Sequence, residues 1–326
     1  MKENGITGKG GLALALLVWA VMAAWAFIMR RPLLNTADTG ICFPSPATWS
    51  LLPGWSFAIN CGAVVLAALG LVILNRRYNF IPSTTLLFAS VFLIAAGACP
   101  WVMISFSAST LLLGANFLGL CILLANYGRR QATTGMFILA TLFSWGSMCQ
   151  YAFLFYLPVY MLSALLMKIL RWKELLAMLM GIAAPYVIVL GFGLVSPQQM
   201  QVPQLSNIWQ QVADGSIGVE LLAVAGTTVT LSVLLLLRNL PSLYSANTAT
   251  RSMGYAFTLP MVVTAALMVI DYGNVLAYYL TMAFFGACQT GYLIAFGPRR
   301  PSPIAYWVVL AIYSGLFLTA AMAGGE

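Results

Sequence analysis

The residues best suited to chemistry are one carboxylate and two guanidinium groups in a polar segment near the N-terminus. Arg30 and Arg31 follow the first apolar run, and Asp38 comes a few positions later. A guanidinium fork binds phosphate oxygens in a bidentate way. A carboxylate serves as a general base toward a hydroxyl, or as a ligand for a divalent cation. The pattern predicts a site for a phosphate-bearing substrate, with Asp38 as the catalytic carboxylate and the two arginines as the phosphate clamp.

The same three residues also have structural interpretations. Asp38 lies in the sequence Asn-Thr-Ala-Asp-Thr-Gly at 35–40, which is typical of a turn. The two arginines would reach lipid phosphates at the membrane surface if they followed a transmembrane helix. The sequence leaves both interpretations open.

A second carboxylate, Asp271, stands in the short segment Asp-Tyr-Gly-Asn between two apolar runs. One interpretation is a tight turn in which Asn274 caps the helix that follows. If Asp271 lies one turn deeper, it is an intramembrane acid, and such acids are functional candidates. Asp271 is therefore a candidate substrate-binding residue.

Several common chemistries are not indicated. The chain contains no His, which removes the usual general base and the commonest transition-metal ligand. Its six cysteines show no CxxC spacing, and there is no P-loop, HExxH or GxSxG motif with a His partner. We predict no metal site, and the sequence points to no particular cofactor.

The composition places the chain in a lipid bilayer. Charged residues make up 7% and apolar residues 62% of its 326 positions, with a mean hydropathy of +0.94. A soluble domain carries roughly a quarter charged residues. Continuous apolar runs such as 64–74 exclude the alternating pattern of a membrane β-barrel. We predict an all-α, polytopic transmembrane helix bundle that forms a single domain over residues 1–326.

A transmembrane helix needs about 20 apolar residues, and runs of this kind recur along the whole chain, predicting about eleven spans. The expected spans are 11–29, 57–74, 84–102, 109–126, 133–147, 152–169, 175–195, 221–237, 253–270, 275–296 and 304–323. The fifth and sixth are the least distinct. Two short helices joined near 147–150 compete there with one long tilted helix and a re-entrant piece.

The basic residues set the predicted orientation, because Lys and Arg favour the cytoplasmic side of a membrane. The side that carries most of them holds Lys2, Lys9, Arg76, Arg77, Arg129, Arg130, Lys168, Arg171, Lys173, Arg238, Arg251, Arg299 and Arg300. The N-terminus is then cytoplasmic and the C-terminus outside, in the inner membrane of a bacterium. Arg30 and Arg31 are exceptions on the outer side. Since the net charge of +8 is spread in pairs among the apolar runs, we predict no nucleic-acid partner.

Two large outer loops follow from this topology, at 30–56 and 196–220. The first is stiffened by prolines and carries Trp49 and Trp55 to anchor it at the membrane surface. In the second, residues 205–212 are expected to form a short interfacial helix, with Ile208 and Trp209 dipping into the headgroups.

Two resemblances extend this picture. The sequence Asn-Arg-Arg-Tyr-Asn-Phe-Ile-Pro at 75–82, Leu-Gly-Ala-Asn-Phe at 113–117 and the pair Arg129-Arg130 look like an uncharacterised family of bacterial multi-pass inner-membrane proteins, over roughly 57–192. That family carries no assigned activity. The architecture resembles the integral-membrane glycosyltransferases of the GT-C class, which take a sugar from a polyprenyl-phosphate carrier at the outer face. Many of these enzymes carry an acidic pair in the first outer loop, where this chain has Asp38 alone.

The second resemblance implies transfer of a sugar, with membrane lipids and a polyprenyl-phosphate carrier as partners and no protein partner indicated. Two alternatives remain, a flippase or transporter of a lipid-linked substrate and a non-enzymatic subunit of an envelope complex. A cavity open to lipid at the outer leaflet would favour transfer. A cavity near the bilayer midplane would favour transport, and a packed bundle without a cavity would favour the subunit.

Overall fold

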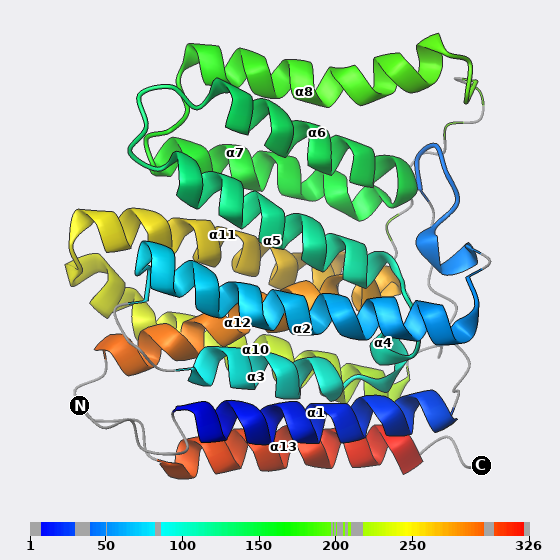
Figure 1. Cartoon of the computed structure of the whole chain (residues 1–326), viewed down its shortest axis with the longest axis vertical. Coiled ribbons are helices and arrows are strands. Elements are labelled where there is room, and N and C mark those ends of the chain that lie inside the picture. Colours follow the sequence, from blue (N-terminus) through cyan, green and yellow to red (C-terminus); the bar gives the residue numbers. More distant parts are fainter. Residues whose placement is uncertain are drawn as a thin grey trace.

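In the computed structural model, the chain forms a bundle of helices that lie side by side (Figure 1). The structure describes residues 8–29, 40–49, 51–81, 86–196, 198, 200, 205, 208–209, 218–296 and 303–322. Within these ranges every regular element is a helix, as the fold class predicts. The α-helices are α1 (Lys9–Met29), α2 (Pro53–Tyr78), α3 (Leu87–Gly97), α4 (Pro100–Ile104), α5 (Ala108–Asn126), α6 (Thr133–Cys149), α7 (Tyr156–Leu166), α8 (Trp172–Gly191), α10 (Val219–Ser245), α11 (Thr248–Ile270), α12 (Val275–Phe296) and α13 (Pro303–Met322).

Six of the described helices are long and apolar enough to cross a membrane. They are α1, α2, α5, α8, α10 and α11. Shorter apolar helices, among them α3, α6 and α7, lie beside them in the bundle (Figure 1). The chain is therefore a multi-pass membrane protein.

The centre of the bundle is built on α3 and α12. Every residue of α3 is buried, and so is every residue of α12 from Val275 to Tyr292. A helix that is apolar on all sides is typical of such a central position. Phe92 of α3 meets Phe284 of α12 edge to face at 5.7 Å, and the Tyr279 hydroxyl donates to the Ala95 carbonyl oxygen at 2.6 Å. The peripheral helices instead expose large apolar side chains, as lipid-facing helices do.

Two helix boundaries differ from the predicted spans for identifiable reasons. The third expected span is divided into α3 and α4, because Pro100 lacks an N–H and begins a new helix after residues 98–99. The uncertain fifth and sixth spans are two helices, α6 and α7, joined by the 3-10 turn η2 (Tyr151–Phe155). The expected interfacial helix at 205–212 lies mostly outside the described residues, although Ile208 and Trp209 are helical.

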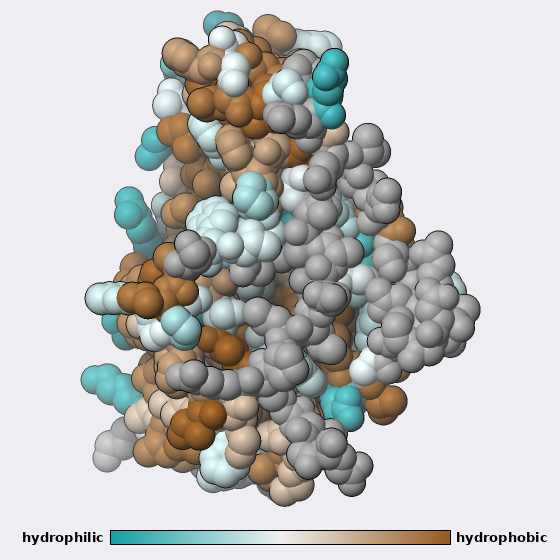
Figure 2. All heavy atoms as spheres, turned by 90° about the vertical axis from the view of Figure 1, so that its right-hand side faces the viewer, coloured by the Kyte–Doolittle hydropathy of each residue, from teal (hydrophilic) through white to brown (hydrophobic). Residues whose placement is uncertain are grey.

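The bundle has two distinct ends (Figure 1). At one, the α5–α6 and α7–α8 connections and the start of α11 come together around residues 127–132, 166–171 and 246–255, and we call this the basic end. At the other, residues 40–49, the α6–α7 corner and the α11–α12 turn meet, and we call this the Asp271 end. Figure 2 looks onto the Asp271 end, where hydrophobic residues gather in the upper part of the view, over the end of α8. Phe192 and Leu194 there are largely exposed.

Candidate functional site

A buried carboxylate, Asp271, lies where α11 ends. Its backbone N–H donates to the Leu267 carbonyl oxygen at 2.8 Å, and its side chain is fully buried. The Tyr278 hydroxyl donates to Oδ2 at 2.8 Å, and the Asn274 amide donates to both carboxylate oxygens at 3.2 Å. These residues are spaced by three and four positions, so the 3-10 turn η4 (Tyr272–Asn274) and the first turn of α12 bring them onto one face.

The third donor comes from a distant part of the chain. Tyr151 belongs to η2, and its hydroxyl lies 3.0 Å and 2.9 Å from the two oxygens of Asp271. The Asn274 amide also donates to this hydroxyl. The carboxylate therefore joins the α6–α7 corner to the α11–α12 turn. Asp271, Tyr151, Asn274 and Tyr278 are together called the Asp271 cluster.

The described partners of the Asp271 carboxylate are hydrogen-bond donors and not a basic side chain. Within the described ranges no basic side chain forms an ion pair with Asp271. Taking an ionised carboxylate out of water costs several kcal/mol, and each hydrogen bond to a charged group returns about 1.5–3 kcal/mol. Two phenol hydroxyls and one amide thus offset the cost of burying this group. The arrangement is consistent with either a structural tie or a site that exchanges a cation.

Several buried polar atoms near the cluster in sequence lack hydrogen-bond partners among the described residues. They are both side-chain amide atoms of Gln150, the Tyr272 hydroxyl and Oδ1 of Asn274. Burial raises the pKa of the Tyr272 hydroxyl, which keeps it protonated. Because most buried polar groups in proteins are paired, the Asp271 end has hydrogen-bonding capacity that its own side chains do not use. The free Oδ1 also shows that Asn274 does not cap α12, which corrects that expectation.

The segment at residues 40–43 returns to this end and docks on the end of α6. The backbone N–H of Cys42 donates to the Met148 carbonyl oxygen at 3.0 Å, and that of Phe43 donates to the same oxygen at 2.9 Å. Gly40 fits tightly there, since a Cβ at this position would stand 2.5 Å from the Met148 carbonyl oxygen. The contact lies just before Tyr151, so the loop segment and the Asp271 cluster share one corner of the bundle.

The structure describes one of the four predicted site residues. Arg30, Arg31 and Asp38 lie outside the described residues. Asp271 is described. It lies at the end of α11, directly before the turn η4, and its side chain is fully buried.

Two members of the cluster, Tyr278 and Tyr151, were not predicted from the sequence. Tyr278 follows Asp271 by seven positions, a helical spacing that could have suggested a shared face. Tyr151 offers no comparable signal, because only the tertiary fold brings it to Asp271. Within the described residues there is no group of three or more His, Cys, Asp or Glu side chains that would hold a metal ion.

Comparisons with known proteins do not identify a family for this chain. No protein-family model matches the chain, and neither a curated protein nor a solved structure is significantly similar to it.

Proposed function

We propose that the protein transfers a sugar from a polyprenyl-phosphate carrier at the outer face of a bacterial inner membrane, as GT-C enzymes do. The observation that carries the proposal is the docking of residues 40–43 on the last turn of α6, beside the Asp271 cluster. A loop that only connects two helices needs no such close contact. The candidate acid, Asp38, stands two positions before Gly40 in the sequence.

The topology in this proposal has about eleven spans, with the N-terminus in the cytoplasm and the C-terminus outside. Support comes from the basic end, where Arg129, Lys168 and Arg251 from three separate connections line one pocket. The positive-inside rule assigns such connections to the cytoplasmic side. The shorter helices, including α3, α6 and α7, supply the spans beyond the six long ones.

In the proposed reaction, Asp38 accepts the proton of the acceptor hydroxyl, and the hydroxyl oxygen forms a bond to the anomeric carbon of the sugar. The bond between that carbon and the carrier phosphate breaks, and the phosphate leaves with its negative charge. Arg30 and Arg31 hold this charge. Asp271 contributes to substrate binding by fixing the corner on which the outer loop rests.

The lipid composition of cells that lack the protein tests this proposal. Mass spectrometry of lipid extracts should show a sugar-charged polyprenyl phosphate accumulating on deletion, and the wild-type gene should reverse the accumulation. Asp38→Asn should not reverse it, although a turn tolerates Asn. Arg30→Lys, which keeps the charge, is the matched control for Arg30→Gln. If deletion leaves every polyprenyl-linked sugar unchanged, the transfer proposal is wrong.

A second candidate is transport of a lipid-linked substrate coupled to a proton or a cation. It is favoured by the full burial of Asp271 without a basic partner in the described ranges. Acids in transmembrane segments recur in proton relays and ion pathways. In this case Asp271→Asn abolishes function and Asp38→Asn leaves it intact. A non-enzymatic envelope subunit would tolerate both substitutions.

A further inference from the structure

A pocket of about 530 Å³ opens at the basic end of the bundle. Its walls come from the α5–α6 connection, the α7–α8 connection and the first turns of α11, which are far apart in the sequence. Five of the lining residues are cations. They are Arg129, Arg130, Lys168, Arg171 and Arg251.

Among the described residues that line the pocket there is no carboxylate to pair these cations. Within the described ranges none of the five forms an ion pair, and Arg171 Nη1 donates only to the Arg130 carbonyl oxygen, at 3.3 Å. Glu174 is the acid closest to them in sequence, but it is buried and accepts the Ala132 N–H at 3.3 Å. Like charges that converge repel one another, and a bound anion relieves that repulsion. The charges that line the pocket therefore favour the binding of an anion.

A general preference for basic cytoplasmic loops does not explain this convergence. The positive-inside bias favours Lys and Arg in each loop, but it does not require them to face one cavity. Lys173 belongs to the same stretch as Arg171 and is exposed, yet it does not line the pocket. The pocket-lining cations form a distinct group, and Lys173 provides a matched control.

Lys168 stands in a backbone conformation that favours glycine. Its φ is 58°, in the left-handed region, just after the end of α7. Its N–H donates to the Leu165 carbonyl oxygen at 3.0 Å, and the next N–H, of Ile169, reaches back to Ala164 at 2.9 Å. Glycine is the usual residue at this kind of helix end. The protein thus carries a lysine in the pocket at a position where the backbone alone would favour glycine.

The wall formed by α11 adds hydrogen-bond donors. Asn247 caps this helix by accepting the Thr250 N–H at 2.8 Å, so the positive end of the helix dipole lies at the pocket. Thr248, Ser252 and Tyr255 place three hydroxyl groups on the same wall. Phosphate oxygens accept hydrogen bonds from such donors and are favoured at helix N-termini.

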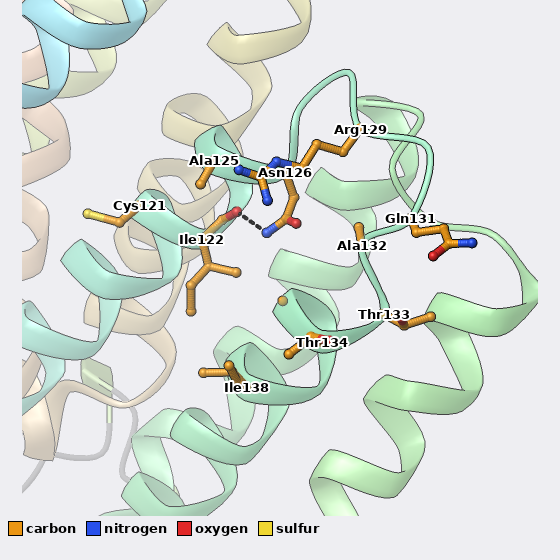
Figure 3. A pocket seen from close by; sticks show the side chains of 11 residues that line it. Cys121, Ile122, Ala125, Asn126, Arg129, Gln131, Ala132, Thr133, Thr134 and Ile138 are labelled. Atoms are coloured by element: carbon orange, nitrogen blue, oxygen red, sulfur yellow. Dashed lines mark hydrogen bonds between the residues drawn. The ribbon is translucent and has the colours of Figure 1, made fainter.

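Arg129 also borders a second hollow of about 520 Å³, which is lined by the end of α5 and the start of α6. Figure 3 shows its side chain reaching back toward Asn126 and Ala125 of α5. The Asn126 amide group donates to the Ile122 carbonyl oxygen at 2.8 Å. Arg129 therefore lines both hollows at the basic end. A ligand with more than one anionic or polar group could occupy both of them.

We propose that the pocket at the basic end binds a phosphate-bearing anion, held by its five cations and by the hydroxyl groups of α11. The proposal concerns the end of the bundle opposite the outer loop, and it does not depend on the transfer function. Either the headgroup of an anionic lipid or a soluble polyphosphate presents the chemistry that this pocket recognises.

The full chain in nanodiscs separates the two sources. In neutral phosphatidylcholine nanodiscs, inorganic pyrophosphate is titrated and its binding followed by calorimetry. In parallel, native mass spectrometry measures cardiolipin retained from mixed bilayers relative to phosphatidylcholine.

The variants are Arg251→Gln, Lys168→Gly and the control Lys173→Gln. Loss of one charged hydrogen-bond donor should weaken binding by about tenfold or more, and higher salt should weaken it further because most of the cations are exposed.

Lys168→Gly separates a binding role from a structural one. Glycine suits the left-handed backbone at this position, so the thermal midpoint of this variant should equal or exceed that of the wild type while its affinity falls. Lys173→Gln should leave affinity unchanged. Retention of cardiolipin alone identifies the lipid source, and binding of pyrophosphate alone identifies the soluble source. The proposal is wrong if neither probe binds, or if Lys173→Gln weakens binding as much as Arg251→Gln and Lys168→Gly do.

Discussion

The Tyr151 hydroxyl contacts both carboxylate oxygens of Asp271, at 3.0 Å and 2.9 Å, across 120 residues of sequence. One phenol thereby ties the turn between α6 and α7 to the turn between α11 and α12. Both turns lie at the end of the bundle to which residues 40–43 return. Asp271 thus fixes the geometry of the corner on which the proposed outer site rests.

Removal of one donor from this carboxylate should cost stability. Tyr151→Phe leaves the buried ring in place but deletes its hydroxyl, so the unfolding free energy should fall by about 1–3 kcal/mol. Tyr278→Phe should act similarly, and the double variant should be non-additive because both hydroxyls serve one acceptor. Thermal unfolding in detergent measures these effects. Tyr244→Phe is the control, because Tyr244 is exposed, and an equal loss there would argue against the cluster.

The docking of residues 40–43 on α6 predicts a strong effect at Gly40. A Cβ there would stand 2.5 Å from the Met148 carbonyl oxygen and 2.6 Å from the Cys149 carbonyl carbon, both of them backbone atoms. Gly40→Ala should therefore release the loop and make it more sensitive to protease added from the outer side. Gly54→Ala is the matched control, because nothing lies within 4 Å of a Cβ at Gly54. Equal protease sensitivity of the two variants would show that the loop is not held on α6.

Cys42 reports which side of the membrane this loop faces. In a variant that keeps Cys42 as its single cysteine, a membrane-impermeant maleimide should label intact spheroplasts, because the proposed topology places the loop outside. Burial raises the pKa of the Cys42 thiol. Less of the reactive thiolate is then present near neutral pH than for a free cysteine, so the labelling rate should keep rising as the pH is raised beyond 8 to 9. Labelling only after the cytoplasmic side is opened would reverse the proposed orientation.

The helices of the bundle were largely predictable, because a long apolar run has few alternatives in a membrane. The division of the third span at Pro100 was harder to predict. Proline is tolerated inside membrane helices when neighbouring helices or side chains satisfy the freed backbone groups. The site was predictable only in part. Asp271 could be found as an acid between apolar runs, but its partner Tyr151 could not, because no local pattern relates residues that only tertiary packing brings together.

The two carboxylates can be compared directly in cells that lack the native protein. Asp38→Asn and Asp271→Asn are expressed at matched levels, and sugar-charged polyprenyl phosphate is quantified in lipid extracts. Sugar transfer at the outer face predicts that Asp38→Asn behaves like the deletion, with the charged carrier accumulating. Asp271→Asn, which keeps one acceptor oxygen in the cluster, should retain most of the activity. The reverse pattern, with Asp38→Asn active and Asp271→Asn inactive, would contradict the transfer account and support coupled transport.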